Sequence, residues 1–130
     1  MEYLLLIYGE ESKVPAREGP EHEKIFAEYI AFTAEVREKG IALGLNPLEP
    51  VSSTKTVRVR NGSAETTDGP FAETKEQLAG YYHLECKDLD EAIAYAARIP
   101  GARWGSIEIR PIRTLNPPTV GRGGDPAPSA

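Results

Sequence analysis

Two histidines and several arginines are the residues of this 130-residue chain best suited to chemistry near neutral pH. His22 begins a segment of helical periodicity and lies three residues before Ile25, so both side chains share one helix face. A neutral imidazole there could act as a general base, and a carboxylate on its other nitrogen would set the tautomer. The alternative is a half-buried histidine that hydrogen-bonds a loop carbonyl and has no chemical role.

A second group of polar residues comes from strand-like alternation. Residues 54–60 and 78–86 each alternate apolar and polar side chains, which places the two kinds on opposite faces of a sheet. If Val57 and Val59 face the helices, the opposite face collects the polar set: Arg58, Arg60, Tyr81, His83, Glu85, Glu108 and Arg110. Such a face is typical of a wet cleft for a small polar ligand, which makes Arg58, Arg60, Tyr81 and His83 candidate ligand-binding residues. The competing interpretation is a set of cross-strand ion pairs, each contributing little.

Several classes of function lack their sequence signals. The chain has no Walker loop, no GxGxxG after a strand, no HExxH and no GxSxG, so no cofactor is expected. The single cysteine, Cys86, and only two histidines argue against a disulfide framework and a structural zinc site. A net charge of −5 disfavours binding to nucleic acids and to anionic membranes. The N-terminal apolar run has no basic flank, so a signal peptide is not expected. We therefore expect a cytoplasmic protein.

The elements that must position these residues follow a recognisable order. Residues 2–8 predict a strand, and residues 21–39 a helix whose apolar positions are Ile25, Tyr29, Phe32 and Val36. Residues 54–60 and 63–67 predict a hairpin joined by Asn61-Gly62, the preferred pair for a type I′ turn. Residues 41–50 predict only a short extended piece and a turn. A strand over 78–86, a helix opened by Asp88 and a strand over 106–112 complete the domain.

The major elements therefore run β-α-β-β-α-β, the ferredoxin-like order of an α+β fold with two helices on one face of an antiparallel sheet. We expect one domain over residues 1–115 and a disordered, Pro- and Gly-rich tail over residues 116–130. The first strand is apolar on both faces, which predicts a homodimer that packs sheet on sheet.

The stretch DGPFAETKEQLAGYY, preceded by TKTVRVRNG and followed by DLDEAIAYAARIPGARWGSIEIRPI, resembles the DGPF branch of the YCII-related proteins. The similarity extends over residues 1–113. It implies a ferredoxin-like subunit that dimerises into an α+β barrel.

The resemblance also implies a site and a partner. YCII-related proteins have been proposed to use a histidine and an aspartate, which correspond here to His22 and to Asp68 of the DGP turn. The side chain of Asp68 could instead serve only to fix that turn by bonding backbone N–H groups. Genes for this branch often lie beside those for sigma factors of the extracytoplasmic-function type, which implies a regulatory association.

Three functions stay open at the level of sequence. The first is a protein that binds a small polar organic molecule, in which His22 and Asp68 transfer protons and Arg58, Arg60, Tyr81 or His83 orient the ligand. The second is a non-catalytic accessory or regulatory protein, with a sigma factor as its partner. The third is a stable dimer without a ligand.

Overall fold

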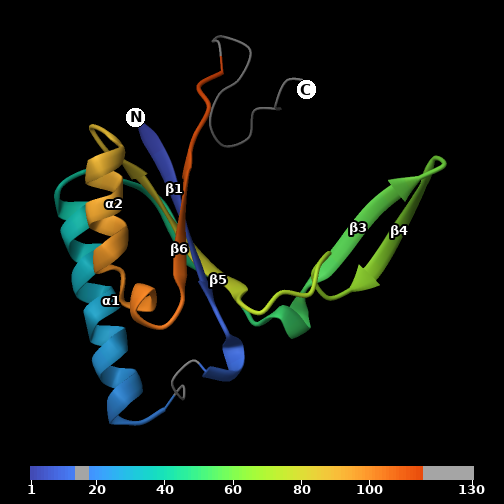
Figure 1. Cartoon of the computed structure of the whole chain (residues 1–130), viewed down its shortest axis with the longest axis horizontal. Coiled ribbons are helices and arrows are strands. Elements are labelled where there is room, and N and C mark those ends of the chain that lie inside the picture. The colour runs from blue at the N-terminus through green and yellow to red at the C-terminus, as the bar shows by residue number, and fades with distance from the viewer. Residues whose placement is uncertain (14–17, 116–130) are drawn as a thin grey trace.

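A computed structural model describes residues 1–13 and 18–115 of the chain. The tail over residues 116–130, for which the sequence predicts disorder, lies outside the described residues. Figure 1 shows a layer of two helices against a sheet, with a two-stranded hairpin that projects from the sheet to one side. No helix in the described ranges is long and apolar enough to cross a membrane.

The sheet has four strands in the order β2-β5-β1-β6, and every neighbouring pair is antiparallel. These strands are β1 (Glu2–Gly9), β2 (Ala42–Pro47), β5 (Gln77–Glu85) and β6 (Ser106–Pro111). The helices α1 (Pro20–Glu38) and α2 (Leu89–Arg98) lie together on one face (Figure 1). Short 3₁₀ turns occur at η1 (Glu11–Lys13), η2 (Val51–Ser53) and η3 (Pro100–Arg103). The ferredoxin-like α+β fold predicted from the sequence is confirmed.

The hydrophobic core lies between the helices and one face of the sheet. Alternate residues of β1 are buried, so Tyr3, Leu5 and Ile7 point into the core while Leu4, Leu6 and Tyr8 point to the other face. The helices, β5 and the residues that follow β5 and α2 contribute the remaining large core side chains: Phe32, Val36, Tyr82, Leu84, Cys86 and Ile99. Burial raises the pKa of the Cys86 thiol, so this side chain behaves as a small apolar group.

Helix ends form where the local sequence predicts them. Pro20 occupies the first turn of α1. Gly40, which follows the C-terminal end of the helix, has a φ of 72°, the left-handed conformation favoured by glycine. In α2 the Asp88 side chain accepts from the Glu91 backbone N–H at 2.9 Å, and the Glu91 carboxylate accepts from the Lys87 N–H at 3.1 Å. These bonds satisfy N–H groups at the start of the helix, as in a capping box.

The strand beside β5 differs from the prediction. Residues 54–60 were expected to form a strand of the sheet, but β2 takes the place beside β5, and residues 41–50 are therefore more than a short extended piece and a turn. β2 is an edge strand, a position that tolerates a proline such as Pro47. A register shift between Ala42 and Gly44 leaves Leu43 without a partner in β5. Ala42 and Leu45 of β2 pack against the core, which Val57 and Val59 do not.

The predicted hairpin forms, but it stands apart from the sheet. β3 (Lys55–Arg60) and β4 (Ser63–Asp68) pair only with each other, and Asn61 and Gly62 have φ values of 53° and 77°, as a type I′ turn requires. Val57 and Val59 are 62% and 63% exposed, and every residue of β4 is exposed. The expectation that these valines face the helices is therefore wrong.

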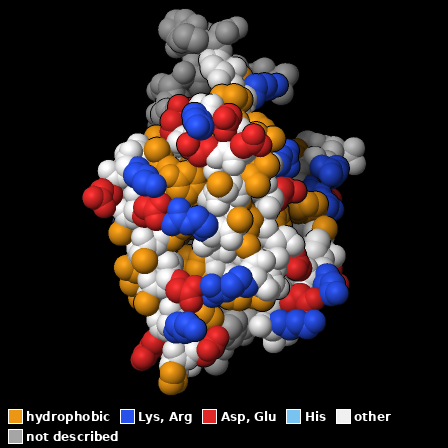
Figure 2. Space-filling view, turned by 60° about the vertical axis from the view of Figure 1, so that its left-hand side comes forward, with side chains coloured by type: hydrophobic (Ala, Val, Ile, Leu, Met, Phe, Trp, Pro, Cys, Tyr) orange, Lys and Arg blue, Asp and Glu red, His pale blue; other side chains and the backbone are white. Residues whose placement is uncertain are grey.

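Ion pairs connect the elements of the helical layer. Glu35 of α1 binds Arg98 of α2 and Lys39, and Glu28 of α1 binds Arg103 of η3. Figure 2, in which the helical side comes forward, shows acidic and basic side chains next to one another on this surface. The Arg98 and Lys39 hydrogen bonds lower the pKa of Glu35 to about 2.

Candidate functional site

His22 lies in the wall of a cleft between the first half of α1 and the sheet. The cleft has a volume of about 410 Å³, and its other walls come from β1, the segment after β2, and η3 with Trp104 behind it. The His22 ring stacks on Phe26, one helical turn later, with ring centroids 6.1 Å apart and 10° between planes. The imidazole is half-buried, so it faces both the cleft and solvent.

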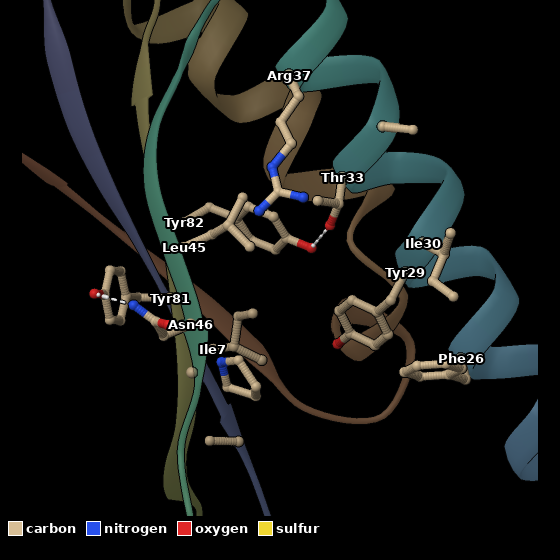
Figure 3. Close-up of a pocket in the computed structure, with 14 residues that line it drawn as sticks. Ile7, Phe26, Tyr29, Ile30, Thr33, Arg37, Leu45, Asn46, Tyr81 and Tyr82 are labelled. Atoms are coloured by element: carbon tan, nitrogen blue, oxygen red, sulfur yellow. Dashed lines mark hydrogen bonds between the residues drawn. The ribbon is translucent and has the colours of Figure 1, made fainter.

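A second cleft of about 490 Å³ adjoins the first along α1. The two share five lining residues, Ile7, Phe26, Tyr29, Pro47 and Ala79. Figure 3 shows the second cleft between α1, which carries Phe26, Tyr29, Ile30, Thr33 and Arg37, and the sheet, which carries Ile7, Leu45 and Tyr82. A continuous, largely apolar groove therefore runs between the helix and the sheet.

Two tyrosines supply polar groups within this groove. The Tyr29 hydroxyl accepts a hydrogen bond from the Gly101 N–H at 3.1 Å, and the Tyr82 hydroxyl lies 2.8 Å from Thr33 Oγ1. Burial raises the pKa of both phenols, so both keep their protons at neutral pH. Because Tyr29 accepts from the backbone, its own proton is available to a ligand oxygen in the cleft.

A glycine in the sheet shapes the floor of the groove. A side chain at Gly80 would place its Cβ 2.9 Å from the Asn46 carbonyl oxygen and 3.2 Å from Pro47 Cα. The close approach of β2 to β5 beside the groove therefore depends on glycine at this position. The neighbouring Ala79 lies at a register shift between β1 and β5, and its carbonyl accepts from the Leu48 N–H at 2.8 Å.

Asp68, the other proposed catalytic residue, lies at the base of the hairpin. Its carboxylate binds Lys55 across the β3–β4 ladder, and its side chain is 86% exposed. The turn is held by Gly69, whose N–H donates to the Thr54 carbonyl at 2.7 Å and whose carbonyl accepts from the Thr56 hydroxyl at 2.7 Å. Asp68 lines neither cleft, so one chain does not bring it together with His22.

The four predicted ligand-binding residues separate into two groups. Tyr81 and His83 lie in β5 opposite Leu6 and Leu4, on the face away from the helices, as expected. There the His83 Nε2 lies 2.7 Å from the Glu2 carboxylate, and the Asn46 side-chain amide donates to the Tyr81 hydroxyl at 2.9 Å. Arg58 and Arg60 were expected on the same face, but they lie on the separate hairpin because β3 is not part of the sheet.

Sequence reasoning missed the groove. It did not include Tyr82, Trp104 or Arg37 among the candidate site residues, although all three line the groove. The signal was a second stripe on α1, Phe26, Ile30, Thr33 and Arg37, whose spacings of four, three and four repeat those of the core stripe one residue later. A helix that buries one apolar stripe against the core leaves a neighbouring stripe, which here is half apolar and half polar, for a different contact.

Among residues 1–13 and 18–115, no group of three or more His, Cys, Asp or Glu side chains could hold a metal ion. The functional groups that line the groove are the imidazole of His22, the phenol hydroxyls of Tyr29 and Tyr82, and the guanidinium of Arg37.

Comparison with known proteins identifies the family. Residues 1–116 match the YCII-related domain. The chain belongs to the YCII-related family. It is 36% identical over 119 residues to the uncharacterised protein R00369 of Rhizobium meliloti (strain 1021), an alignment that covers 90% of this chain and 96% of that protein.

A solved structure shares the fold. It is the 5-chloro-2-hydroxyhydroquinone dehydrochlorinase TftG from Burkholderia phenoliruptrix AC1100, in complex with 2,5-dihydroxybenzoquinone. The TM-score is 0.52 at 12% sequence identity, and the match covers 87% of this chain and 94% of that one. At this identity the similarity shows the fold alone.

Proposed function

We propose that this YCII-related protein binds a small organic molecule in the groove between α1 and the sheet, and that His22 exchanges a proton with it. The observation that supports this proposal is the juxtaposition of a half-buried imidazole with an apolar groove that contains neutral phenol hydroxyls. Apolar walls with a few polar groups are typical of small-molecule sites. An imidazole is the side chain best suited to proton transfer near neutral pH.

The related fold of TftG, seen with 2,5-dihydroxybenzoquinone, supports a small oxygen-rich ring as a first probe. The phenol of Tyr29 would donate to a ligand oxygen, while the ring of Phe26 would pack against the ligand. Since Asp68 binds Lys55 and lines neither cleft, proton transfer is assigned to His22 alone within one chain.

The two histidines provide a direct test, because His22 faces the groove and His83 lies on the opposite face of the sheet. Titration with 2,5-dihydroxybenzoquinone, followed by NMR of the histidine ring protons, is expected to shift the His22 signal and leave the His83 signal in place. His22→Gln identifies the signal, and Asp68→Asn tests whether that carboxylate takes part. A shift of His83 alone, or of neither ring, contradicts the proposal.

We also propose that the protein is a homodimer. The open face of the sheet carries Leu4, Leu6 and Tyr8 beside Tyr81, and all four are only partly exposed in one chain. A second copy packed on this face would remove these apolar groups from water. Light scattering is expected to give the dimer mass for the wild type and the monomer mass for Leu6→Asp. A monomer mass for the wild type contradicts the proposal.

One observation favours a second function, that of a non-catalytic regulatory protein. The hairpin region exposes Val57, Val59 and Phe71, the last at 79%, which is a large apolar surface for a projecting segment. The sigma-factor association implied by the sequence resemblance would use this surface. Loss of binding to a purified sigma factor in Val57→Ser/Val59→Ser, with the His22 response retained, would favour it.

A further inference from the structure

The groove carries a cation at the end farthest from His22. Arg37 lies in the last turn of α1, and Figure 3 shows its guanidinium beside Thr33 and Tyr82 in the wall of the larger cleft. No ion pair in the described part of the chain joins Arg37 to a carboxylate, and the positions three and four residues away on the helix hold no acidic residue. Arg98 and Arg103, by contrast, each bind a glutamate of α1.

A hydroxyl proton lies beside this cation. Thr33 Oγ1 and the Tyr82 hydroxyl are 2.8 Å apart, and only one of them can donate to the other. The hydroxyl that accepts keeps a proton for another acceptor. A guanidinium and a hydroxyl donor at one end of an apolar groove together suit a carboxylate, because charge-assisted hydrogen bonds from arginine to carboxylates are among the strongest in proteins.

The wall between Arg37 and His22 is apolar and long. Fifteen residues of helix separate them, or about 22 Å between their Cα atoms at 1.5 Å per residue. Between them Phe26 and Ile30 remain 58% and 54% exposed, although each lines the groove. Leu45 and Pro47 face them from β2. A single ring held by Arg37 leaves His22 out of reach, whereas an extended apolar molecule covers both.

We propose that the ligand of this groove is an elongated amphipathic acid, whose carboxylate binds Arg37 and whose apolar chain lies along Phe26 and Ile30 toward His22. This inference rests on the proposed function, because it names the chemical class of the molecule that reaches His22. Arg37 could bind any anionic oxygen group, and carboxylates and sulfate esters both carry one. The test therefore compares a sulfate ester with the carboxylate. Arg37 is a binding residue in this proposal and His22 is the group at the reacting end.

The test measures binding of decanoate, below its micelle concentration, by calorimetry to the full chain and to Arg37→Gln. Arg37→Gln is expected to weaken decanoate binding about tenfold or more, since a hydrogen bond to a charged group contributes more than one between neutral groups. Arg37→Lys keeps the charge and should retain part of the affinity. Arg113→Gln, which removes an exposed arginine outside both clefts, is the matched control and should bind like the wild type.

Three further ligands define the anchor and the length. Decanamide should bind the wild type more weakly than decanoate and should be insensitive to Arg37→Gln, while decyl sulfate shows whether the site accepts either anion. Hexanoate, held at Arg37, should leave the His22 ring signal unmoved, whereas decanoate should shift it. Equal binding of decanoate and decanamide, or unchanged decanoate affinity in Arg37→Gln, overturns the acid anchor.

The outcomes separate this inference from the proposed function. If the His22 signal responds to decanoate in Arg37→Gln with undiminished affinity, the acid anchor fails and binding in the groove stands. If Arg37→Gln weakens decanoate binding while the His22 signal never moves, Arg37 binds acids but His22 takes no part. If the guanidinium served only to stabilise the negative end of the helix dipole, Arg37→Gln would lower the melting temperature and leave decanoate affinity unchanged, which would overturn the acid anchor.

Discussion

The four-stranded sheet and the β3–β4 hairpin have similar strand signals in the sequence and very different surroundings in the structure. β5 and the residue after it alternate Tyr82, Leu84 and Cys86 with polar residues, and all three are buried. β3 alternates Val57 and Val59 with arginines in the same way, and both valines are more than 60% exposed. Alternation thus predicts that a strand forms, but not which surface covers its apolar face.

The largest effect that separates the two regions is expected from truncating one buried and one exposed aliphatic side chain. Leu84→Ala should lower the free energy of unfolding by about 2–5 kcal/mol, because the side chain is fully buried and leaves a cavity. Val59→Ala should change it by no more than about 0.5 kcal/mol in the isolated chain. Urea denaturation measures both. A larger Val59→Ala loss that grows with protein concentration would show that a second copy covers the hairpin.

A smaller effect is expected from adding a methyl group at two glycines. The Cβ of an alanine at Gly105 would lie 2.0 Å from the Tyr8 carbonyl oxygen, so the chain after η3 must shift away from β1. Gly105→Ala should cost about 1–3 kcal/mol of global stability. Gly62, in the hairpin turn, has no atom within 4 Å but a φ of 77°.

Gly62→Ala should therefore strain the turn and speed hydrogen exchange in β3 and β4 without changing the global unfolding midpoint. Hydrogen exchange and thermal unfolding of the two variants distinguish local from global destabilisation. A lower midpoint for Gly62→Ala would contradict the independence of the hairpin.

The smallest effect is expected from the ion pairs, and it depends on pH. Hydrogen bonds from Arg98 and Lys39 lower the pKa of Glu35 from its usual value of 4.5 to about 2, so the folded chain favours the carboxylate. The stabilisation is complete above about pH 4.5 and is lost as the pH falls toward 2. Glu35→Gln should lower the melting temperature at pH 7 by a modest amount that shrinks below pH 4.5.

Asp68→Asn removes the corresponding ion pair of the hairpin. Because Lys55 and Asp68 are both mostly exposed, this substitution should leave the melting temperature unchanged across the same pH range. Melting curves at pH 7, 4 and 3 measure both variants. An equal effect of the two substitutions would show that the hairpin unfolds together with the sheet.

Most of the fold could be predicted because its signals are local. The apolar period of α1, the Asp88 cap and the Asn61-Gly62 turn each depend on residues close in sequence, and each is confirmed. The choice of β2 as the strand next to β5 could not be predicted in the same way. It depends on how Ala42 and Leu45 pack against distant residues, and Gly44 and Pro47 obscure the strand pattern.

The candidate site was predicted only in part. His22 was identified, and the structure places it in a cleft, while the roles of Asp68, Arg58 and Arg60 in binding or catalysis stay predictions. Arg37 and Tyr29 could not be recognised as cleft residues, because their surroundings come from β2, β5 and η3, far away in the sequence. The assignment to the DGPF branch also stays a prediction.

The base of the hairpin has a consequence for engineering the chain. Thr54 and Gly69 are joined by a 2.7 Å backbone hydrogen bond, and Lys55 and Asp68 form an ion pair directly above it, so the segment leaves and returns at nearly one point. A short linker could therefore replace residues 55–68 without stretching the connections to β2 or β5. A foreign loop or a reporter peptide could also be inserted at this point, so the hairpin is a segment that can be replaced while the rest of the domain keeps its structure.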